Sequence, residues 1–291
     1  MPERDGYIPG VPCWVDTSQP NPGAAAAFYH DLFDWELEDV MPPDSPAKYF
    51  MARLHGGDVA AIGPLPEGAP PMATWNTYIW VVSADETAAK VREAGGRTLT
   101  EPFDVMDAGR MAVFADPEGA VFSVWQAGTH KGARIVNEAG SLNFNGLNTR
   151  DIETAKRFYG SVFGWRTLTI GGAELWTLPG YGDYLEERDP GLRKRTAEFG
   201  TLGFEDVVAT INPITAGQGN VPASWTVTFA IDDADAVATR AAALGGRVLA
   251  PPFDAPWVRM TVISDPQGAV FTASRFVPES RSESGSADRA A

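Results

Sequence analysis

The chain has 291 residues, 44% of them hydrophobic and 21% charged, and its formal net charge is −15. This acidity argues against duplex nucleic acid or an anionic membrane surface as a partner, because both favour a basic protein face. Cys13 is the single cysteine, which excludes an intramolecular disulfide and suits a reducing cytosol. There is no signal-peptide-like stretch at the start and no apolar run of membrane-spanning length, so we expect a soluble, cytoplasmic protein.

The first half of the chain is predicted to form a strand, a helix and three strands, and then the same order again. The first helix, at 24–33, follows Asn21-Pro22, which supply an N-cap and a first-turn proline. The second helix, at 84–94, ends at Gly95-Gly96. Strands are expected at 13–17, 35–40, 49–54, 59–62, 74–82, 97–104, 110–115 and 120–125.

The second half follows the same plan, with one addition. Helices are expected at 151–163 and from Asp232-Asp233 to Gly245-Gly246. Residues 180–200 have no counterpart in the first half; their charge density is typical of a solvated excursion, and a lid or a flap at a domain interface is the alternative. We expect domains at 10–127 and 142–277, a linker at 128–141, and a tail at 278–291 that is too polar to order itself.

Three short blocks occur twice along the chain, in the same order. AFYHDLFDW at 27–35 matches RFYGSVFGW at 157–165, and AGGRTLTEPFD at 94–104 matches LGGRVLAPPFD at 244–254. DPEGAVF at 116–122 matches DPQGAVF at 265–271, and its first four residues are typical of a type I turn. Two copies of one domain therefore occupy nearly the whole sequence.

These blocks resemble the vicinal oxygen chelate superfamily, which includes glyoxalase I, bleomycin-resistance proteins and extradiol dioxygenases. The Phe-Tyr pairs in the helices, the Gly-Gly helix stops and the Asp-Pro-x-Gly turns carry the resemblance. It implies an α+β fold of two tandem glyoxalase-like domains, each a pair of βαβββ modules forming an open eight-stranded cup. The chain looks most similar to a two-domain actinobacterial branch labelled hydroxylase or glyoxalase-like, on segments such as Trp14-Val15-Asp16 and 75–78.

The resemblance also implies where metal-using relatives place their ligands. The first-strand position falls on Trp14 and Phe144, the fifth-strand position on Asn76 and Thr226, and the eighth-strand position on Ser123 and Thr272. Rings, hydroxyls and an amide are poor replacements for imidazole and carboxylate ligands, so we predict no metal and no other cofactor. The three histidines, His30, His55 and His130, are expected on the surface.

Strand alternation predicts what the two cups contain. If Trp14, Asn76 and Ser123 face inward, then Asp16, Tyr78 and Trp125 do so as well, which makes the first cup aromatic with a few polar groups. Arg110 could pair with a ligand anion or brace a turn, and the matching Arg259 is assigned a structural role. The second cup is expected to present Phe144, Gly146, Thr226, Thr228, Thr272, Ser274 and Trp176.

The leading hypothesis is metal-independent binding of a small, aromatic or polyketide-like molecule. The ligand-binding residues would be Trp14, Asn76, Ser123, Trp125, Arg110, Phe144, Thr226 and Thr272. The alternative for the rings is that they fill the core or the contact between the two copies.

A cofactor-independent cyclase, isomerase or accessory hydroxylase is the second hypothesis, with Asp16 as general base and Tyr78 or Asn76 stabilising an enolate. A metal-dependent lyase or dioxygenase and a non-catalytic scaffold are weaker alternatives, and homodimerisation is left open.

Overall fold

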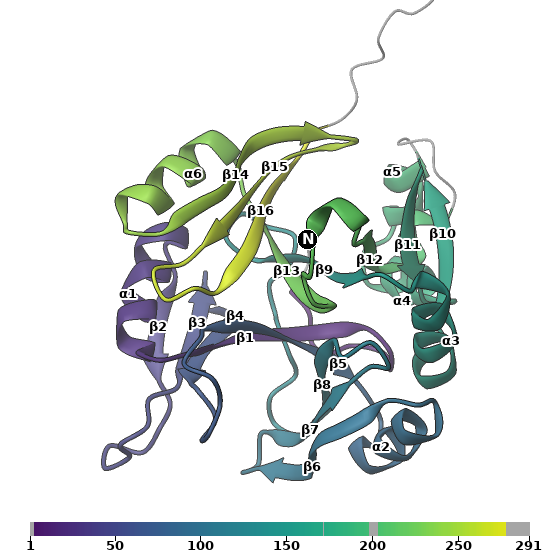
Figure 1. Ribbon diagram of the computed structural model, residues 1–291, viewed down its shortest axis with the longest axis horizontal. Coiled ribbons are helices and arrows are strands. Elements are labelled where there is room, and N and C mark those ends of the chain that lie inside the picture. The colour runs from purple at the N-terminus through teal and green to yellow at the C-terminus, as the bar shows by residue number, and fades with distance from the viewer. Residues whose placement is uncertain (1–2, 171, 198–202, 278–291) are drawn as a thin grey trace, which may run out of the picture.

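The computed structural model describes residues 3–170, 172–197 and 203–277, so the predicted tail at 278–291 lies outside it. Two eight-stranded mixed sheets form the fold, and each belongs to one half of the chain (Figure 1). Both are open sheets, as expected for two tandem glyoxalase-like domains. No helix among residues 3–170, 172–197 and 203–277 is long and apolar enough to cross a membrane.

The first sheet has the strand order β2-β3-β4-β1-β5-β8-β7-β6. Its centre is the antiparallel pair β1 and β5, and each of these strands pairs in parallel with the last strand of its own module. The strands are β1 (Pro12–Gln19), β2 (Glu36–Asp39), β3 (Phe50–Leu54), β4 (Gly57–Pro64), β5 (Thr74–Trp80), β6 (Arg97–Val105), β7 (Gly109–Ala115) and β8 (Val121–Ala127). Helices α1 (Pro22–Phe33) and α2 (Ala84–Glu93) follow β1 and β5.

The second sheet repeats this topology, with the order β10-β11-β12-β9-β13-β16-β15-β14. Its strands are β9 (Leu142–Thr149), β10 (Arg166–Ile170), β11 (Ala173–Thr177), β12 (Val207–Pro213), β13 (Ser224–Ala230), β14 (Arg247–Ala255), β15 (Val258–Ser264) and β16 (Val270–Phe276). Helices α3 (Ile152–Phe163) and α6 (Ala234–Ala243) follow β9 and β13. Gly146 of β9 takes the position that Asp16 takes in β1. Each of these residues pairs with the equivalent residue in each of its two neighbouring strands.

The four helices that follow β1, β5, β9 and β13 each begin at a side chain that accepts a backbone hydrogen bond. The Asn21 side chain accepts from the amide of Ala24, and Pro22 occupies the first turn of α1 as predicted. Ser83 caps α2 and Asp151 caps α3 in the same way. These local signals explain why the helix positions could be predicted.

The two halves interlock, because each first helix packs against the sheet of the other half. Figure 1 shows α1 beside α6 and the β14–β16 part of the second sheet, while α3 lies beside α2. The Tyr29 hydroxyl donates to Asp265 Oδ2 at 3.0 Å and accepts from Trp75 Nε1 at 3.1 Å. One carboxylate oxygen of Asp265 therefore accepts a hydrogen bond from the first half of the chain. The other oxygen accepts hydrogen bonds from backbone amides of the turn that Asp265 itself begins.

The same arrangement occurs at the opposite side of the molecule. The Tyr159 hydroxyl donates to Asp116 Oδ2 at 3.0 Å and accepts from Trp225 Nε1 at 2.9 Å. All the rings involved are buried. The repeated Phe-Tyr and Asp-Pro-x-Gly blocks are thus partners of each other, each block contacting its complement in the other copy.

The segment at 180–200 contributes two helices, α4 (Tyr181–Arg188) and α5 (Leu192–Ala197), followed by a short turn, η1 (Phe204–Asp206). Tyr184 donates to the carbonyl of Gly6 at 2.9 Å, and Arg4 donates to the Tyr181 hydroxyl at 2.7 Å. The described part of the insertion is therefore a flap packed on the N-terminal segment, which corrects the expectation of a solvated excursion. Tyr181, buried at the start of α4, anchors it.

Candidate functional site

A buried carboxylate lies on the floor of the first cup. Asp16 of β1 is 7% exposed and accepts three side-chain hydrogen bonds. Asn76 Nδ2 donates to one of its oxygens at 2.8 Å, while the hydroxyls of Tyr78 and Tyr49 donate to the other at 2.9 and 3.0 Å. Asn76 and Tyr78 come from β5, which pairs with β1, so the predicted inward-facing residues of these strands are brought together.

Tyr49, just before β3, is the member of this cluster that the sequence reasoning missed. Its ring reaches Asp16 across Gly63 of β4, where an added Cβ would lie 2.8 Å from the ring. Tyr49 precedes Met51 by two residues. Strand alternation was therefore the signal that could have placed the Tyr49 side chain on the same face of the sheet as that of Met51. A glycine in the neighbouring strand then marks the space for its ring.

Burial raises the pKa of the Asp16 carboxyl, and the hydrogen bonds from Asn76, Tyr78 and Tyr49 oppose that shift. Burial, together with the neighbouring carboxylate, holds the pKa of Tyr78 and that of Tyr49 well above the usual range. Both phenols are consequently protonated donors at neutral pH. Asp16 is a stronger base than an exposed carboxylate, which suits it to accept a proton.

Two tryptophans and a histidine line the cup next to this cluster. The Trp14 ring meets the His130 ring edge-on at a centroid distance of 4.4 Å, and Trp125 lies 5.7 Å from the same imidazole. Trp125 Nε1 donates to the carbonyl of His130 at 3.0 Å, so this ring nitrogen is already hydrogen-bonded within the protein. The expectation that His130 lies on the surface was wrong, because the linker carries its ring into the cup.

The His130 imidazole is mostly enclosed. Burial lowers its pKa, an effect that the Asp58 carboxylate opposes. Its Nε2 is buried and makes no hydrogen bond with any residue of 3–170, 172–197 or 203–277. Neutral imidazole with one unbonded nitrogen is therefore a further polar group of the first cup that sequence reasoning did not assign.

The floor of the first cup is made of buried side chains, whereas Phe103 at its rim is exposed. Trp14, Ser123 and Trp125 are all 5% exposed or less, so these side chains fill the floor, as the alternative interpretation of the rings expected. Phe103 of β6 faces Met111 of β7 in register and is 42% exposed. Paired residues on antiparallel strands share a face, so Phe103 and Met111 extend the apolar wall to the rim.

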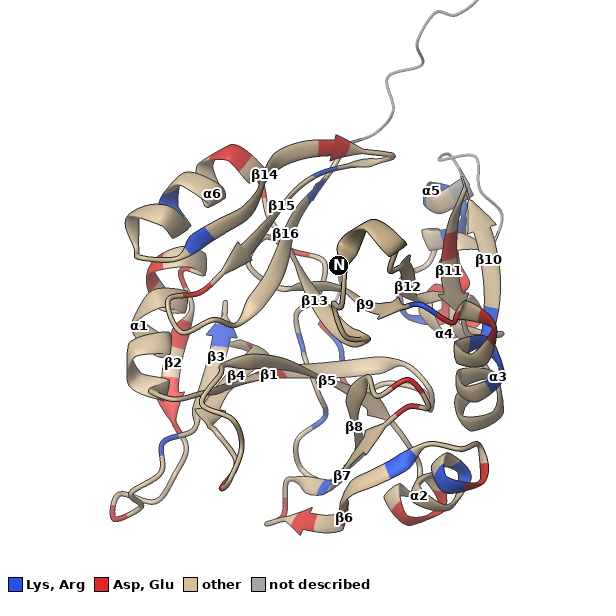
Figure 2. Ribbon diagram, viewed as in Figure 1, with Lys and Arg blue, Asp and Glu red and all other residues tan. Residues whose placement is uncertain are grey.

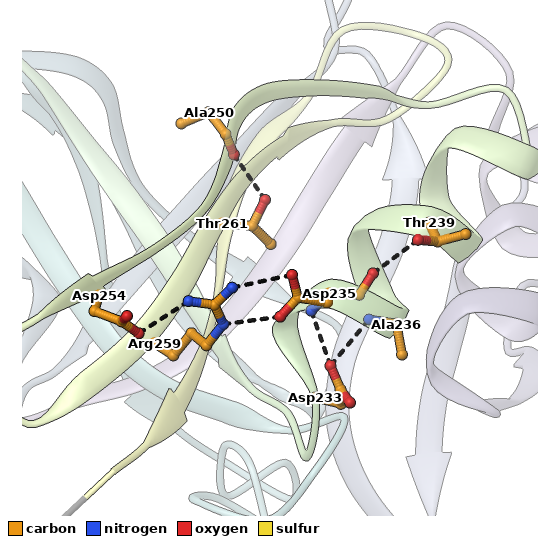
Figure 3. Close-up of polar contacts among 8 residues, drawn as sticks. All are labelled: Asp233, Asp235, Ala236, Thr239, Ala250, Asp254, Arg259 and Thr261. Carbon is orange, nitrogen blue, oxygen red and sulfur yellow. Dashed lines mark hydrogen bonds and ion pairs between the residues drawn. The ribbon is translucent and has the colours of Figure 1, made fainter.

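Arg110 lies on the opposite face of the sheet and is removed from the predicted ligand-binding residues. Its guanidinium donates to both oxygens of Asp85 at 2.8 and 3.0 Å, and to Asp104 at 2.9 Å. Figure 3 shows the equivalent arrangement in the second half, where Arg259 joins Asp235 and Asp254. Both arginines therefore brace a helix start against the edge of a sheet, which is the structural role predicted for Arg259.

The second cup has neutral polar side chains in place of the Asp16 cluster, with Asn148 Nδ2 donating to Ser224 Oγ at 3.2 Å and Asn212 Nδ2 donating to Asn148 Oδ1 at 3.1 Å. Thr226 donates to the carbonyl of Gly146 at 3.1 Å, and Thr272 faces Thr228 in register. Phe144 is half-buried at the start of the cup. A Cβ at Gly146 would lie 2.5 Å from Thr210 Oγ1, so this site has no room for a carboxylate equivalent to Asp16. Trp176, expected in this cup, instead packs with tilted rings against Tyr159 and Trp165 in the core between the halves.

The side chains do not fit a metal centre of the superfamily type. Trp14, Asn76 and Ser123 stand at the ligand positions of the first cup, and Phe144, Thr226 and Thr272 at those of the second. Within the described ranges, no group of three or more His, Cys, Asp or Glu side chains is arranged to hold a metal ion. Asp16 instead accepts three hydrogen bonds from neutral side chains.

Comparison with known proteins gives matches along both halves. The family model described as Glyoxalase/Bleomycin resistance protein/Dioxygenase superfamily matches residues 16–124 and 141–272. A protein of Mycobacterium tuberculosis that carries the name glyoxylase CFP32 is 41% identical over 96% of this chain and 100% of its own length. Anthracycline biosynthesis protein DnrV of Streptomyces peucetius is 33% identical over 91% of this chain and 93% of its own.

Solved structures of low sequence identity share the fold. The Mn(II)-bound glyoxalase from Novosphingobium aromaticivorans superposes with a TM-score of 0.58 at 16% identity, covering 92% of this chain and 83% of that one. The 2,2',3-trihydroxybiphenyl 1,2-dioxygenase from Sphingomonas wittichii gives 0.56 at 12% identity, with 94% of both chains covered.

Proposed function

Given that the chain belongs to the glyoxalase/bleomycin resistance protein/dioxygenase superfamily, we propose that it binds a small planar aromatic molecule in its first cup without a resident metal. The observation that carries this proposal is the buried Asp16 carboxylate, held by Tyr49, Tyr78 and Asn76 beneath an apolar rim. An aromatic wall with a few convergent polar groups is typical of sites for flat organic ligands. The anthracycline biosynthesis proteins among the relatives support a polycyclic aromatic ligand class.

Each part of the cup has a role in this proposal. Phe103 and Met111 offer exposed apolar surface on which a ring system can stack. Tyr49 and Asn76 are partly exposed, so their polar atoms are the first that a ligand hydroxyl or carbonyl reaches. Trp14 and Trp125 shape the floor from beneath, and a ligand that enters deeply must move one of them.

A second candidate function, proton transfer on the bound molecule, is favoured by the protonation chemistry of Asp16. Its carboxylate would accept a proton from an acidic C–H or phenolic O–H, and the electron pair left behind would reside on a ligand oxygen. The Tyr78 hydroxyl and the Asn76 amide, which donate to the Asp16 carboxylate in the free protein, would turn to that oxyanion once Asp16 is protonated. This reaction needs no oxidant and no cofactor.

Binding can be tested with quinizarin, a planar dihydroxyanthraquinone, by calorimetry and by quenching of tryptophan fluorescence. Phe103→Ala should weaken binding at least about tenfold, a loss of about 1.4 kcal/mol. Phe253→Ala is the matched control, since Phe253 is also 42% exposed and faces Met260 as Phe103 faces Met111. Equal effects of the two substitutions, or saturable binding that neither changes, would contradict the proposal.

The metal-free character and the proton transfer need separate measurements. Elemental analysis of the gently purified protein should find no stoichiometric metal, and a chelator should leave quinizarin binding unchanged. If the second candidate is correct, apo-protein turnover of an enolisable substrate persists with chelator and is lost in Asp16→Asn while binding remains. Metal-dependent conversion of a hemithioacetal would instead favour a glyoxalase-type lyase.

A further inference from the structure

A cavity of about 190 Å³ lies away from the first cup, between the N-terminal segment and the α4–α5 flap. It opens at the beginning of β9 and β12, and its apolar wall includes Leu185, Leu192, Phe204 and Val208. Phe144, at the start of the second cup, is among its lining residues, whereas Thr226 and Thr272 are not, so the cavity lies at the edge of that cup and away from its centre. The flap that forms one wall is the segment without a counterpart in the first half.

A guanidinium faces this apolar space. Arg4 lines the cavity and lies over the rings of Tyr7 and Tyr181, at 5.1 and 5.9 Å from their centroids. Its Nη1 donates to the Tyr181 hydroxyl at 2.7 Å. Throughout residues 3–170, 172–197 and 203–277, no carboxylate forms an ion pair with Arg4, because the neighbouring Glu3 and Asp5 face Arg134 and Arg188 instead.

The other charged groups around the cavity are mutually engaged. Glu205 also lines it, and one of its carboxylate oxygens lies 4.0 Å from Arg193 Nε. Arg193 pairs with Asp183 and Arg195 pairs with Asp189. Figure 2 shows acidic and basic residues together on α4 and α5 at the edge of the molecule. Arg4 is therefore the cation that remains available to a bound molecule.

We propose that this cavity is a second ligand site, which takes a small organic acid whose carboxylate pairs with Arg4 and whose apolar body lies against Leu185 and Phe204. A guanidinium presents its donors in a planar fork that matches a carboxylate, and sandwiching by tyrosine rings fixes its orientation. The volume equals that of about six water molecules, which suits an acid with a single ring.

Benzoate is a suitable probe, and benzamide is its uncharged match in shape. Calorimetry on the full chain should detect saturable binding of benzoate and at least about tenfold weaker binding of benzamide. Arg4→Met, which keeps the packing of the stem, should reduce benzoate affinity at least about tenfold. Arg134→Met is the control, because that guanidinium is exposed and pairs with Glu3 outside the cavity.

Leu185→Trp supplies an independent check, since it fills the cavity while keeping Arg4, and it should abolish binding. Asp16→Asn and Phe103→Ala should leave benzoate binding unchanged, so failure of this site and failure of the proposed function give different patterns. Absence of benzoate binding, equal affinity for benzamide, or full affinity in folded Arg4→Met or Leu185→Trp would each overturn the proposal.

Discussion

The hydrogen-bonded contact between Tyr29 and Asp265 makes a quantitative prediction about stability. Tyr29→Phe removes a donor to a charged carboxylate and leaves Trp75 Nε1 buried without its acceptor. A hydrogen bond to a charged group contributes about 1.5–3 kcal/mol, and an unsatisfied buried donor costs about 1–3 kcal/mol. Because Asp265 retains Gln19 at 2.7 Å on the same oxygen, we expect a net loss of about 3 kcal/mol.

Urea unfolding, followed by circular dichroism and tryptophan fluorescence, measures this loss. Tyr159→Phe should lose at least as much, because its hydroxyl has equivalent partners in Asp116 and Trp225 and no other described residue donates to Asp116 Oδ2. The two sites share no residue, so the double variant should lose at least about 6 kcal/mol, with additivity within about 0.5 kcal/mol. Tyr184→Phe is the control, since its hydroxyl donates to Gly6 in a partly exposed position and should contribute about 1 kcal/mol or less.

Two results would refute the reasoning. A loss below about 1 kcal/mol in Tyr29→Phe would mean that its hydroxyl contributes little beyond what solvent replaces. A second unfolding transition, in which one half melts while the other persists, would mean that the halves do not depend on each other. We expect a single transition in the wild type and in each single variant.

Three further predictions follow from individual side chains. Because burial raises the pKa of Asp16, the folded chain binds a proton at this carboxyl more readily than the unfolded chain. The stability of the wild type relative to Asp16→Asn should therefore fall as pH rises from the ordinary carboxyl pKa through the raised one. Urea midpoints at several pH values measure this difference, and a difference that does not change with pH would contradict the raised pKa. Arg110→Met and Arg259→Met should lower thermal stability by equal, salt-sensitive amounts and leave quinizarin binding intact; unequal losses, or weaker binding in Arg110→Met alone, would return Arg110 to the site. Gly146→Ala should destabilise the second domain by about 1–3 kcal/mol in the same urea assay, because the added Cβ would clash with the side chains of Thr210 and Asn212. An unchanged urea midpoint would mean that these side chains move aside without cost.

Local signals explain why the fold could be predicted from the sequence. The repeats and the Asn21-Pro22 and Gly95-Gly96 boundaries depend on residues close together in the chain, and the observed α1 begins two residues before the predicted helix. Alternation along β1 and β5 also placed Asp16, Asn76 and Tyr78 on one face, and the structure brings them into contact. Their role in binding or catalysis stays a prediction.

The remaining site features depend on tertiary placement. Tyr49 reaches Asp16 only because Gly63 leaves space in a neighbouring strand, and His130 enters the cup because the linker runs along β1. Arg110 occupies a strand next to inward-facing Met111, so strand register decided which way it points. The Arg4 cavity joins segments nearly two hundred positions apart, a closeness that no local pattern encodes.

The exchange of tyrosine and aspartate between the copies bears on how such a chain could arise. A lone ancestral copy would hold both the Phe-Tyr helix and the Asp-Pro-x-Gly turn, yet could satisfy neither within itself. It would have needed a second molecule of its own kind, related by a two-fold axis. Joining two copies in one chain makes that contact intramolecular, at an effective concentration of about millimolar. The first copy carries a buried acid at Asp16, whereas the second has glycine at the equivalent position, Gly146.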